Sequence, residues 1–322
     1  MDVSIIICCY NSAKRIVTTL EYLAKLSLDD LKVELILVDN NCSDNTVSVA
    51  ENEWSKLNSP FPLRVIREET PGLSNARMAG AKISTAELIV FCDDDNWLDS
   101  KYIVNATEIF KRSEKIGAIG GITKLVTNFE GDLPFFFQSN LHEYAVGAQY
   151  NREGILGDDK YYLWGAGLVI NRSLFMKCFS SIPSLLKDRS GDSLSSGGDT
   201  EICARFLMLG YSLYYDPNLI LFHWIDKSRI DNNYFQKLIK GHDESSVVIS
   251  NYWTFLRYFN KGKLGFITRI VNNKIMLLKA TIFLNRKNIH WYFQQIVFQL
   301  KWIFSIPFPL KKIFFIKRTL LK

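Results

Sequence analysis

The chain of 322 residues lacks the segments that would carry it through a membrane. No basic stretch precedes its first apolar run, residues 5–9, which is far too short for the core of a signal peptide. In the tail, residues 261–322, lysine and arginine interrupt every apolar stretch before it reaches the ~18 residues that a bilayer span requires. We therefore expect a protein that remains in the cytoplasm.

Cysteine is scarce and its spacing carries no metal or disulfide signal. The six cysteines form no CxxC pair, and four of them lie in apolar stretches, so we expect buried thiols in a reducing compartment. The turn after the first predicted strand, Cys9-Tyr10-Asn11-Ser12, also lacks two phosphate-binding patterns. It has no GxGxxG, which a dehydrogenase would need, and no glycine-rich basic loop of the kind expected in a sugar-nucleotide nucleotidylyltransferase.

Acidic residues are absent from the tail. Residues 261–322 contain thirteen lysines and arginines, whereas the whole chain carries a net charge of only +6, so the first 260 residues carry −7. At 48% hydrophobic and 22% charged residues the chain is globular. An acidic body is therefore joined to a strongly basic, aromatic-rich tail.

Apolar strands and amphipathic helices alternate through the first ninety residues. Strands are predicted at residues 3–8, 33–38, 63–66 and 88–92, and helical spacing follows each of the first three. This alternation is typical of an α/β protein with a doubly wound, mostly parallel sheet. Further strands are predicted at 116–126, 161–170 and 213–225, and a helix at 199–209.

Polar residues follow three of these strands. Ligands bind at the carboxyl ends of the strands in such sheets, so Tyr10-Asn11, Asp39 and Asp93-Asp94-Asp95 should gather at one edge. Three adjacent carboxylates repel one another unless a cation is present, and a hard divalent metal prefers oxygen ligands. The alternative for the three aspartates is a solvated acidic turn.

Taken in order, these residues resemble glycosyltransferase family 2, whose members are inverting enzymes with a GT-A fold. The resemblance covers roughly residues 1–225. It is carried by five motifs in the expected order: Cys9-Tyr10-Asn11, Val38-Asp39-Asn40 with Ser43-Asp44-Asn45-Thr46, Pro71-Gly72-Leu73-Ser74-Asn75-Ala76-Arg77, Asp93-Asp94-Asp95, and Gly198-Asp199-Thr200-Glu201.

The resemblance implies a nucleotide-sugar donor site with a divalent metal, Mg²⁺ or Mn²⁺. Asp95 is the expected metal ligand, and Asp93 would contact the ribose or the metal through water. Asp39 would contact the nucleobase, commonly uracil, or else only cap its strand. The other donor-binding residues that the motifs imply are Cys9, Tyr10, Asn11, Arg77 and Asp94. Arg77 would reach the diphosphate or be an ordinary surface arginine.

The same resemblance implies that Asp199 is the general base, which takes the proton of the acceptor hydroxyl. The family often has a glutamate before this aspartate, whereas this chain has Gly198, so Glu201 becomes a candidate for orienting the acceptor. The alternative for Asp199 is a helix cap. His223 occupies a position near the metal or diphosphate, although a lone histidine is often structural. Trp164 and Gly165 match the acceptor side, although Trp164 could be a core residue.

We expect a catalytic domain at 1–228, with a nucleotide-binding half at 1–115 and an acceptor half at 116–228, and a helical extension at 229–322. The basic tail, 261–322, is suited to an anionic membrane surface, which would place the protein peripherally at the cytosolic face and favour a lipid-linked glycan acceptor in polysaccharide synthesis. Packing on the body or a subunit interface are the alternatives for the tail. No nucleic acid is expected, and a catalytically silent binding protein is the non-enzymatic alternative.

Overall fold

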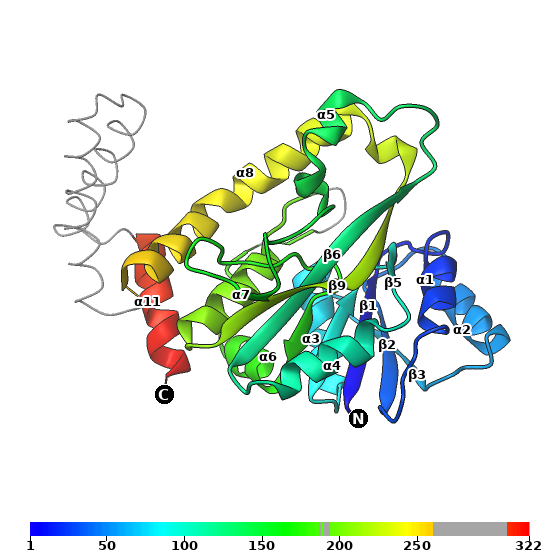
Figure 1. The fold of residues 1–322 in the computed structure, drawn as a ribbon, viewed down its shortest axis with the longest axis horizontal. Helices are drawn as coiled ribbons and strands as arrows, with labels where there is room; N and C mark the ends of the chain where they lie inside the picture. The colour runs from blue at the N-terminus through cyan, green and yellow to red at the C-terminus, as the bar shows by residue number, and fades with distance from the viewer. Residues whose placement is uncertain (187, 190–193, 260–307, 322) are drawn as a thin grey trace. The chain divides into compact units, whose positions relative to one another are not determined.

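The computed structural model describes residues 1–186, 188–189, 194–259 and 308–321. The chain divides into two compact units, Met1–Ser246 and Val247–Lys322 (Figure 1). The first unit contains the predicted sheet and both predicted halves of the catalytic domain. It also includes the first part of a long helix beyond residue 228, so the boundary at 228 stays a prediction.

The first unit is built on one sheet, which has nine strands within the described residues. The strand order is β3-β2-β1-β4-β8-β6-β9-β5, and β7 pairs with β9. Strands β1 to β4 form the parallel, doubly wound half that the sequence predicts, and β8 and β5 join antiparallel. The strands are β1 Val3–Cys9, β2 Val33–Asp39, β3 Leu63–Arg67, β4 Leu88–Cys92, β5 Asn96–Leu98, β6 Ile116–Thr127, β7 Gly154–Ile155, β8 Val169–Asn171 and β9 Ser212–Ile225.

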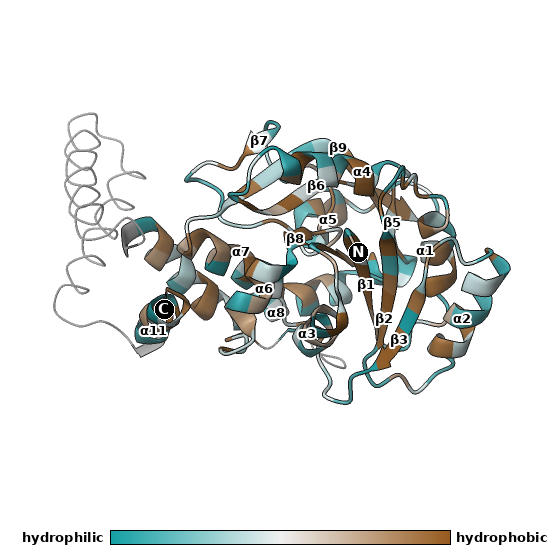
Figure 2. Ribbon diagram, turned by 90° about the horizontal axis from the view of Figure 1, so that it is seen from below, coloured by the Kyte–Doolittle hydropathy of each residue, from teal (hydrophilic) through white to brown (hydrophobic). Residues whose placement is uncertain are grey.

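Helices connect the strands and lie on both faces of the sheet (Figures 1 and 2). The α-helices that lie wholly in this unit are α1 Ile16–Leu23, α2 Thr46–Lys56, α3 Leu73–Ile83, α4 Tyr102–Lys111, α5 Phe135–Gln138, α6 Arg172–Phe179 and α7 Gly198–Met208, and short 3₁₀ turns are η1 Leu141–Tyr144 and η2 Lys227–Arg229. Their exposed sides are hydrophilic, whereas β1 and β2 are hydrophobic along most of their length (Figure 2).

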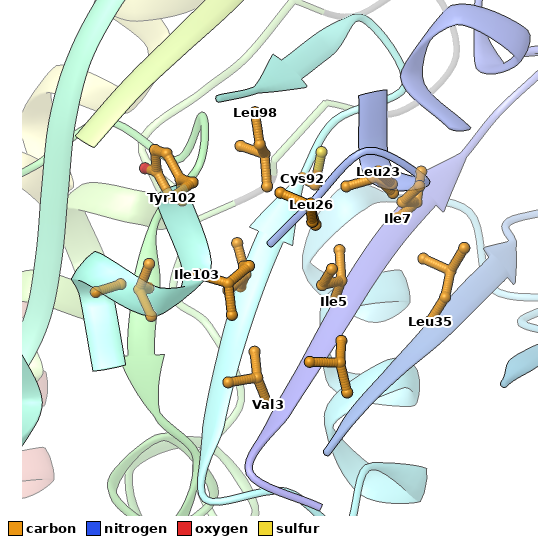
Figure 3. Packing of buried hydrophobic residues seen from close by; sticks show 14 of the residues in the cluster. Val3, Ile5, Ile7, Leu23, Leu26, Leu35, Cys92, Leu98, Tyr102 and Ile103 are labelled. Atoms are coloured by element: carbon orange, nitrogen blue, oxygen red, sulfur yellow. The ribbon is translucent and has the colours of Figure 1, made fainter. Parts of the chain in front are cut away.

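Alternation along β1 supplies side chains to both layers of the core. Ile5 and Ile7 point to one side, where they pack with Leu35, Cys92 and Leu98 (Figure 3). Ile6 points to the other side, toward α3. Gly80 allows this helix to approach closely, because a Cβ at position 80 would lie 2.6 Å from Cγ2 of Ile6.

The long ribbon of β6 and β9 extends the sheet beyond its parallel half (Figure 1). The pairing shifts register between Gly120 and Ile122, where β9 carries the residues around Asp216 as a bulge. A glycine is needed at position 121, at this register shift, because a Cβ there would clash with the carbonyl oxygen of Leu219 at 1.9 Å. Asp216 and Pro217 thus lie in a bulge inside one continuous strand, as the predicted strand at 213–225 requires.

The strand predicted at 161–170 is wrong for most of its length, since β8 is only Val169–Asn171. The backbone N–H groups before it are bonded by side chains instead of a neighbouring strand. Trp164 N–H donates to Gln149 Oε1 at 2.5 Å, and Gly165 N–H donates to Asp199 Oδ2 at 2.8 Å. Apolar residues there signal burial, which the sequence pattern does not separate from strand formation.

The second unit is helical in its described residues. Helix α8, Asn232–Thr254, begins in the first unit and ends in the second, where the π-helical turn η3, Phe255–Phe259, follows it. Helix α11, Phe308–Leu320, packs on this turn through Phe314, whose ring centroid lies 4.9 Å from that of Phe255. No helix among the described residues has the length and apolar character to cross a bilayer. Residues 260–307 of the predicted extension lie outside the described residues.

Candidate active site

The carboxyl ends of β1, β2 and β4 meet at one edge of the sheet, as the sequence predicts. Cys9 pairs with Asp39 in the ladder between β1 and β2, and Ile7 pairs with Cys92 in the ladder between β1 and β4. Asn11, Asp39 and Asp93 therefore leave adjacent strands at the same level. This edge is where a ligand binds in doubly wound sheets.

Asn11 ties the first two of these loops together, and Asp39 caps the second loop. Asn11 adopts the left-handed backbone region with φ of 51°, and its Oδ1 accepts hydrogen bonds from the N–H groups of Ser43 and Asp44 at 2.8 and 3.3 Å. Asp39 Oδ1 accepts from Cys42 N–H at 2.8 Å, while Oδ2 lies 3.5 Å from Arg67 Nη1. The Asp39 carboxylate is thus both a turn cap and one half of an ion pair.

The expected donor contacts of the first motif differ in accessibility. Tyr10 is 47% exposed, so its ring is available to a ligand. Cys9 has no exposure, and its thiol faces the core. The prediction that Cys9 binds the donor is therefore wrong for its side chain, because alternation along β1 turns this residue inward. Its carbonyl oxygen accepts a hydrogen bond from Asn40 N–H at 2.9 Å.

The three consecutive aspartates have separate partners. Asp93 Oδ2 accepts from Asn96 Nδ2 at 2.8 Å. Asp94 is held by Arg15, whose Nη2 and Nε lie 2.6 and 3.2 Å from Oδ2. The carboxylate of Asp94 is therefore engaged in an internal ion pair, which is a poor arrangement for the predicted donor contact.

Asp95 faces a guanidinium and an imidazole from the far end of the first unit. Arg229 Nη1 donates to its Oδ2 at 2.9 Å, and His223 Nε2 lies 3.7 Å from its Oδ1. The antiparallel pairing of Asn96 with His223 between β5 and β9 brings these residues together. Burial alone would raise the pKa of Asp95, but the charges of His223 and Arg229 outweigh burial and lower it.

The other two carboxyls have the opposite tendency. Burial raises the pKa of Asp93, and Asp95 adds to the rise while Arg77 acts against it. Burial and the charge of Asp95 also raise the pKa of Asp94 in spite of Arg15. The acidic cluster is thus electrostatically costly except at Asp95, where charge is best stabilised.

Arg77 lies below the surface between two sets of carboxylates. Its Nη1 is 3.7 Å from Asp188 Oδ2, its guanidinium lies over the ring of Phe91 at 5.1 Å, and only 6% of its side chain is exposed. Burial opposes the charged form of Arg77, but Asp188, Asp93 and other acids more than compensate and raise its pKa. The interpretation of Arg77 as an ordinary surface arginine is therefore wrong.

Asp199 sits at the start of α7, close to Arg77. Its Oδ2 accepts from Gly165 N–H at 2.8 Å, and its Oδ1 accepts from Thr200 N–H at 2.6 Å. Gly165 has no room for a side chain, because a Cβ would lie 2.6 Å from Nη2 of Arg77. Trp164 is 9% exposed, so its side chain is largely core.

Glu201 has no exposure and is part of a buried ion pair, so its predicted contact with the acceptor is wrong. Its Oε1 accepts from Arg205 Nη2 at 2.7 Å, and both side chains are fully buried. Its carboxylate also accepts from Ser184 Oγ and from Leu185 N–H. Glu201 projects from α7 toward the 182–186 segment and fixes that segment to the helix.

A pocket of about 400 Å³ lies between the first turn of α3, α6 and the start of α7. Its wall includes Gly72, Phe175 and Phe179, and the ion pair of Arg77 and Asp188 lines it as well. The pocket therefore borders the guanidinium that also faces Asp199.

A comparison with known families assigns this arrangement. The model described as "Glycosyl transferase family 2" matches residues 4–179, which is more than half of the chain. The chain belongs to glycosyl transferase family 2. The predicted resemblance is confirmed, and the matched residues contain the edge formed by Asn11, Asp39 and the three aspartates.

Curated members of this family match shorter segments. The putative glycosyltransferase EpsH of Bacillus subtilis is 33% identical over 100 residues, which are 31% of this chain and 28% of EpsH. The poly-beta-1,6-N-acetyl-D-glucosamine synthase of Staphylococcus epidermidis is 30% identical over 119 residues, which are 37% of this chain and 28% of the synthase. The chain thus matches less than a third of the length of these relatives.

Solved structures of glycosyltransferases share the fold. The structure of Staphylococcus aureus TarS 1–349 in complex with UDP-GlcNAc has a TM-score of 0.53 at 15% identity, and covers 80% of this chain and 73% of TarS. The mannosyltransferase PcManGT of Pyrobaculum calidifontis in complex with GDP-Man and Mn²⁺ has a TM-score of 0.54 at 16% identity, and covers 99% of this chain and 84% of PcManGT. The predicted GT-A fold is confirmed.

A metal site in this family 2 protein would rest on few side chains. Within the described part of the chain, no three His, Cys, Asp or Glu side chains are arranged to hold a metal. His223 is 7% exposed, its Nδ1 has no hydrogen-bond partner, and its Nε2 faces Asp95. Asp95 and His223 therefore fit a divalent ion that takes its remaining ligands from a diphosphate and water. Asp93, bonded to Asn96, fits a water-mediated contact.

Sequence reasoning missed Arg15, Asp188 and Arg229. The sequence gives a weak indication for Arg229 as a site residue, because it lies six residues after His223. His223 was already a candidate, near the end of the strand predicted at 213–225. Arg15 and Asp188 belong to no motif. Their roles arise from contacts between distant segments, to Asp94 and Arg77 respectively.

Proposed function

We propose that this protein is a metal-dependent, inverting glycosyltransferase that moves a sugar from a nucleotide-sugar donor to a glycan acceptor in cell-surface polysaccharide synthesis. One observation carries the proposal: Gly165 donates its N–H to Asp199 Oδ2 at 2.8 Å, and a Cβ on Gly165 would lie 2.6 Å from Arg77 Nη2, so the candidate base and the buried guanidinium are neighbours. Asp93 is among the acids that raise the pKa of the same guanidinium. The acidic donor-side cluster and the candidate base thus border one buried cation. This arrangement supports attack on one side of a sugar and departure of a diphosphate on the other.

Asp39, Tyr10 and Asn11 form the nucleotide end of the site in this proposal. The carboxylate of Asp39 suits the ring N–H of uracil, so we propose a UDP-linked donor. The fold neighbour TarS, whose structure contains UDP-GlcNAc, supports this choice of base. Arg77 and Arg229 supply positive charge for the diphosphate, and their guanidinium groups can form paired hydrogen bonds to phosphate oxygens.

Asp95 and His223 would hold the divalent metal, Mg²⁺ or Mn²⁺. When bound, this ion neutralises the charge that develops on the leaving diphosphate. The solved neighbour PcManGT, which contains Mn²⁺ together with GDP-Man, supports metal use in this fold. The chain's own contribution is to keep Asp95 ionised, which the guanidinium of Arg229 favours.

Asp199 is the proposed general base. It takes the proton of the acceptor hydroxyl as the acceptor oxygen forms a bond to the anomeric carbon, while the bond from that carbon to the diphosphate oxygen breaks. The attack comes from the face opposite the leaving group, so the configuration inverts. The hydrogen bond from Gly165 N–H fixes one oxygen of the Asp199 carboxylate and thereby orients this carboxylate within the site.

A lipid-linked glycan is the proposed acceptor class, and the basic tail supports a peripheral position at the cytosolic face of a membrane. In helix α11, Phe315 is 63% exposed beside the exposed Lys311 and Lys312. Aromatic and basic side chains together suit an anionic lipid surface. Flotation with vesicles containing anionic lipid tests this part, and equal binding by the full chain and by residues 1–259 would refute it.

A transfer assay with and without Mn²⁺ tests the proposed reaction. A thermal-shift screen of UDP-linked and GDP-linked sugars identifies the donor first, because a tight ligand stabilises the folded state. Asp199→Asn should then lower kcat by about 10²-fold or more while donor binding persists. Glu114→Gln, on an exposed turn after α4, is the matched control and should leave kcat unchanged.

The same assay separates the alternatives. A catalytically silent binding protein would be stabilised by the donor but would release no nucleotide diphosphate with any acceptor preparation. Wild-type kcat in Asp199→Asn would contradict the base assignment while leaving the enzyme class intact.

A further inference from the structure

The carboxylate of Asp188 occupies the space that a side chain at position 198, at the start of α7, would need. A Cβ built on Gly198 would lie 2.2 Å from Oδ2 of Asp188 and 3.1 Å from its Cγ. Side chains do not tolerate such contacts, so either position 198 stays a glycine or Asp188 must move. The clash explains the glycine that the sequence places directly before Asp199.

Asp188 is not free to move away. Its side chain is 4% exposed, and its Oδ1 accepts from its neighbour Arg189 N–H at 3.1 Å. Its Oδ2 accepts from Ser74 Oγ at 3.3 Å and lies 3.7 Å from Arg77 Nη1. A second backbone contact holds the segment, because Leu73 N–H donates to the carbonyl oxygen of Arg189 at 3.0 Å. The carboxylate is therefore anchored to the first turn of α3.

The guanidinium that Asp188 holds is confined on its other side as well. Nη2 of Arg77 lies 2.6 Å from the position that a Cβ on Gly165 would take. Gly165 in turn donates its N–H to Asp199. A continuous set of contacts thus runs from Asp188 through Arg77 and the Gly165 backbone to the candidate base.

We propose that Asp188 is a positioning residue for the transfer reaction: it holds Arg77 against the Gly165 backbone that binds Asp199, and Gly198 is required because it leaves room for the Asp188 carboxylate. The inference rests on the proposed function. A buried guanidinium needs a charged partner, and without one it would turn toward Asp93 or Asp199 and disturb both. Asp188 acts through Arg77 and does not itself contact the donor.

The same proximity suggests a test. A carboxylate attached to position 198 would lie close to the place that the Asp188 carboxylate now occupies. Asp188→Asn keeps the size of the side chain and removes its charge. We expect kcat to fall by about 10-fold to 100-fold, since a displaced catalytic group loses about that much. The donor KM should rise by a smaller factor, since Arg77 also supplies charge for the diphosphate, and the melting temperature should stay within a few degrees of wild type.

The double variant Asp188→Gly with Gly198→Asp relocates the charge. We expect the double variant to recover kcat to within about fivefold of wild type. Gly198→Asp alone should lose activity, because its side chain would clash with that of Asp188. Asp188→Gly with Gly198→Asn is the matched control. It has the same shape as the relocated variant but no charge, and it should not recover.

Three results would overturn the proposal. Wild-type kcat in folded Asp188→Asn would show that the charge is not needed. A folded double variant with Gly198→Asp that recovers no more than its Gly198→Asn counterpart would do the same. Equal losses of kcat in all variants in proportion to the loss of folded protein, measured by circular dichroism, would make Asp188 merely structural. Failure of the proposed function is distinct, because the wild-type protein would then transfer no sugar.

Discussion

Arg229 donates a hydrogen bond of 2.9 Å to Asp95, a residue 134 positions earlier in the chain. The guanidinium also lies 5.4 Å from the ring of Tyr234, and only 19% of its side chain is exposed. Burial opposes its charge, yet Asp95 raises the pKa of Arg229 overall. A positive charge is thus fixed beside the carboxylate best suited to bind a metal.

The first prediction concerns this arginine. Arg229→Gln should raise the donor KM by about 10-fold to 100-fold, because a hydrogen bond to a charged group contributes about 1.5–3 kcal/mol. Arg229→Lys should lose less, since it keeps the charge without the paired geometry. Lys227→Gln, exposed on the same turn, is the control for steady-state kinetics. Unchanged KM in Arg229→Gln would remove Arg229 from the donor site.

The second prediction concerns the cost of the acidic cluster. A carboxyl with a raised pKa, such as Asp93, binds its proton more tightly in the folded than in the unfolded state. Its ionisation therefore destabilises the protein as the pH rises above the unfolded pKa, and the penalty is complete once the pH exceeds the folded pKa.

Asp93→Asn should accordingly raise the melting temperature of the ligand-free protein by about 2–4 °C at pH 7.5. The gain should shrink as the pH falls through the raised pKa of Asp93 and should vanish below the ordinary pKa of an aspartate, about 3.9. Differential scanning calorimetry from pH 7.5 down to about pH 3 measures this, with the exposed Asp132→Asn as control. A lower melting temperature at pH 7.5 would mean that the bond to Asn96 outweighs the electrostatic cost.

The third prediction separates structure from catalysis at Glu201. Glu201→Gln should lower the free energy of unfolding by about 3 kcal/mol, because it leaves the buried charge of Arg205 without its partner. Among molecules that remain folded at low temperature, kcat and the donor KM should match wild type. Urea denaturation and kinetics at 10 °C provide both numbers. A specific loss of kcat in fully folded protein would return Glu201 to the reaction.

The fourth prediction concerns His223. His223→Gln should raise the Mn²⁺ concentration needed for half-maximal stabilisation, measured in the presence of UDP by thermal shift, by at least about tenfold. His142→Gln is the control, because that side chain is 63% exposed and pairs with Glu143 instead. Identical Mn²⁺ titrations for His223→Gln and wild type would leave Asp95 without this partner.

The sequence predicts the parallel half of the sheet because its strands are short apolar runs separated by helical periodicity. A helix follows each of the first three strands, as predicted, and Asn11, Asp39 and Asp93 meet because parallel strands end at a common edge. The local pattern of apolar residues and the rule that parallel strands end at one edge are enough to predict these features.

The remaining site depends on contacts that no local pattern encodes. The antiparallel pairing of β5 with β9 places His223 beside Asp95, although three residues are too few to reveal β5 as a strand. Glu201 shares its helix with Asp199 but faces the opposite way and is fully buried, which the local sequence does not indicate. Asp188 is found only through the space that Gly198 leaves.

The pairing of β5 with β9 also bears on the protein's synthesis. Strands β1 to β4, whose ends form the proposed nucleotide edge, all lie before residue 93, but Asp95 lacks His223 and Arg229 until the ribosome has released residues 223–229. Contacts of such long range form late in folding. A nascent chain that stalls before β9 is thus expected to expose a finished nucleotide edge next to an uncompensated acidic cluster, a species that binds the nucleotide weakly and cannot process a sugar.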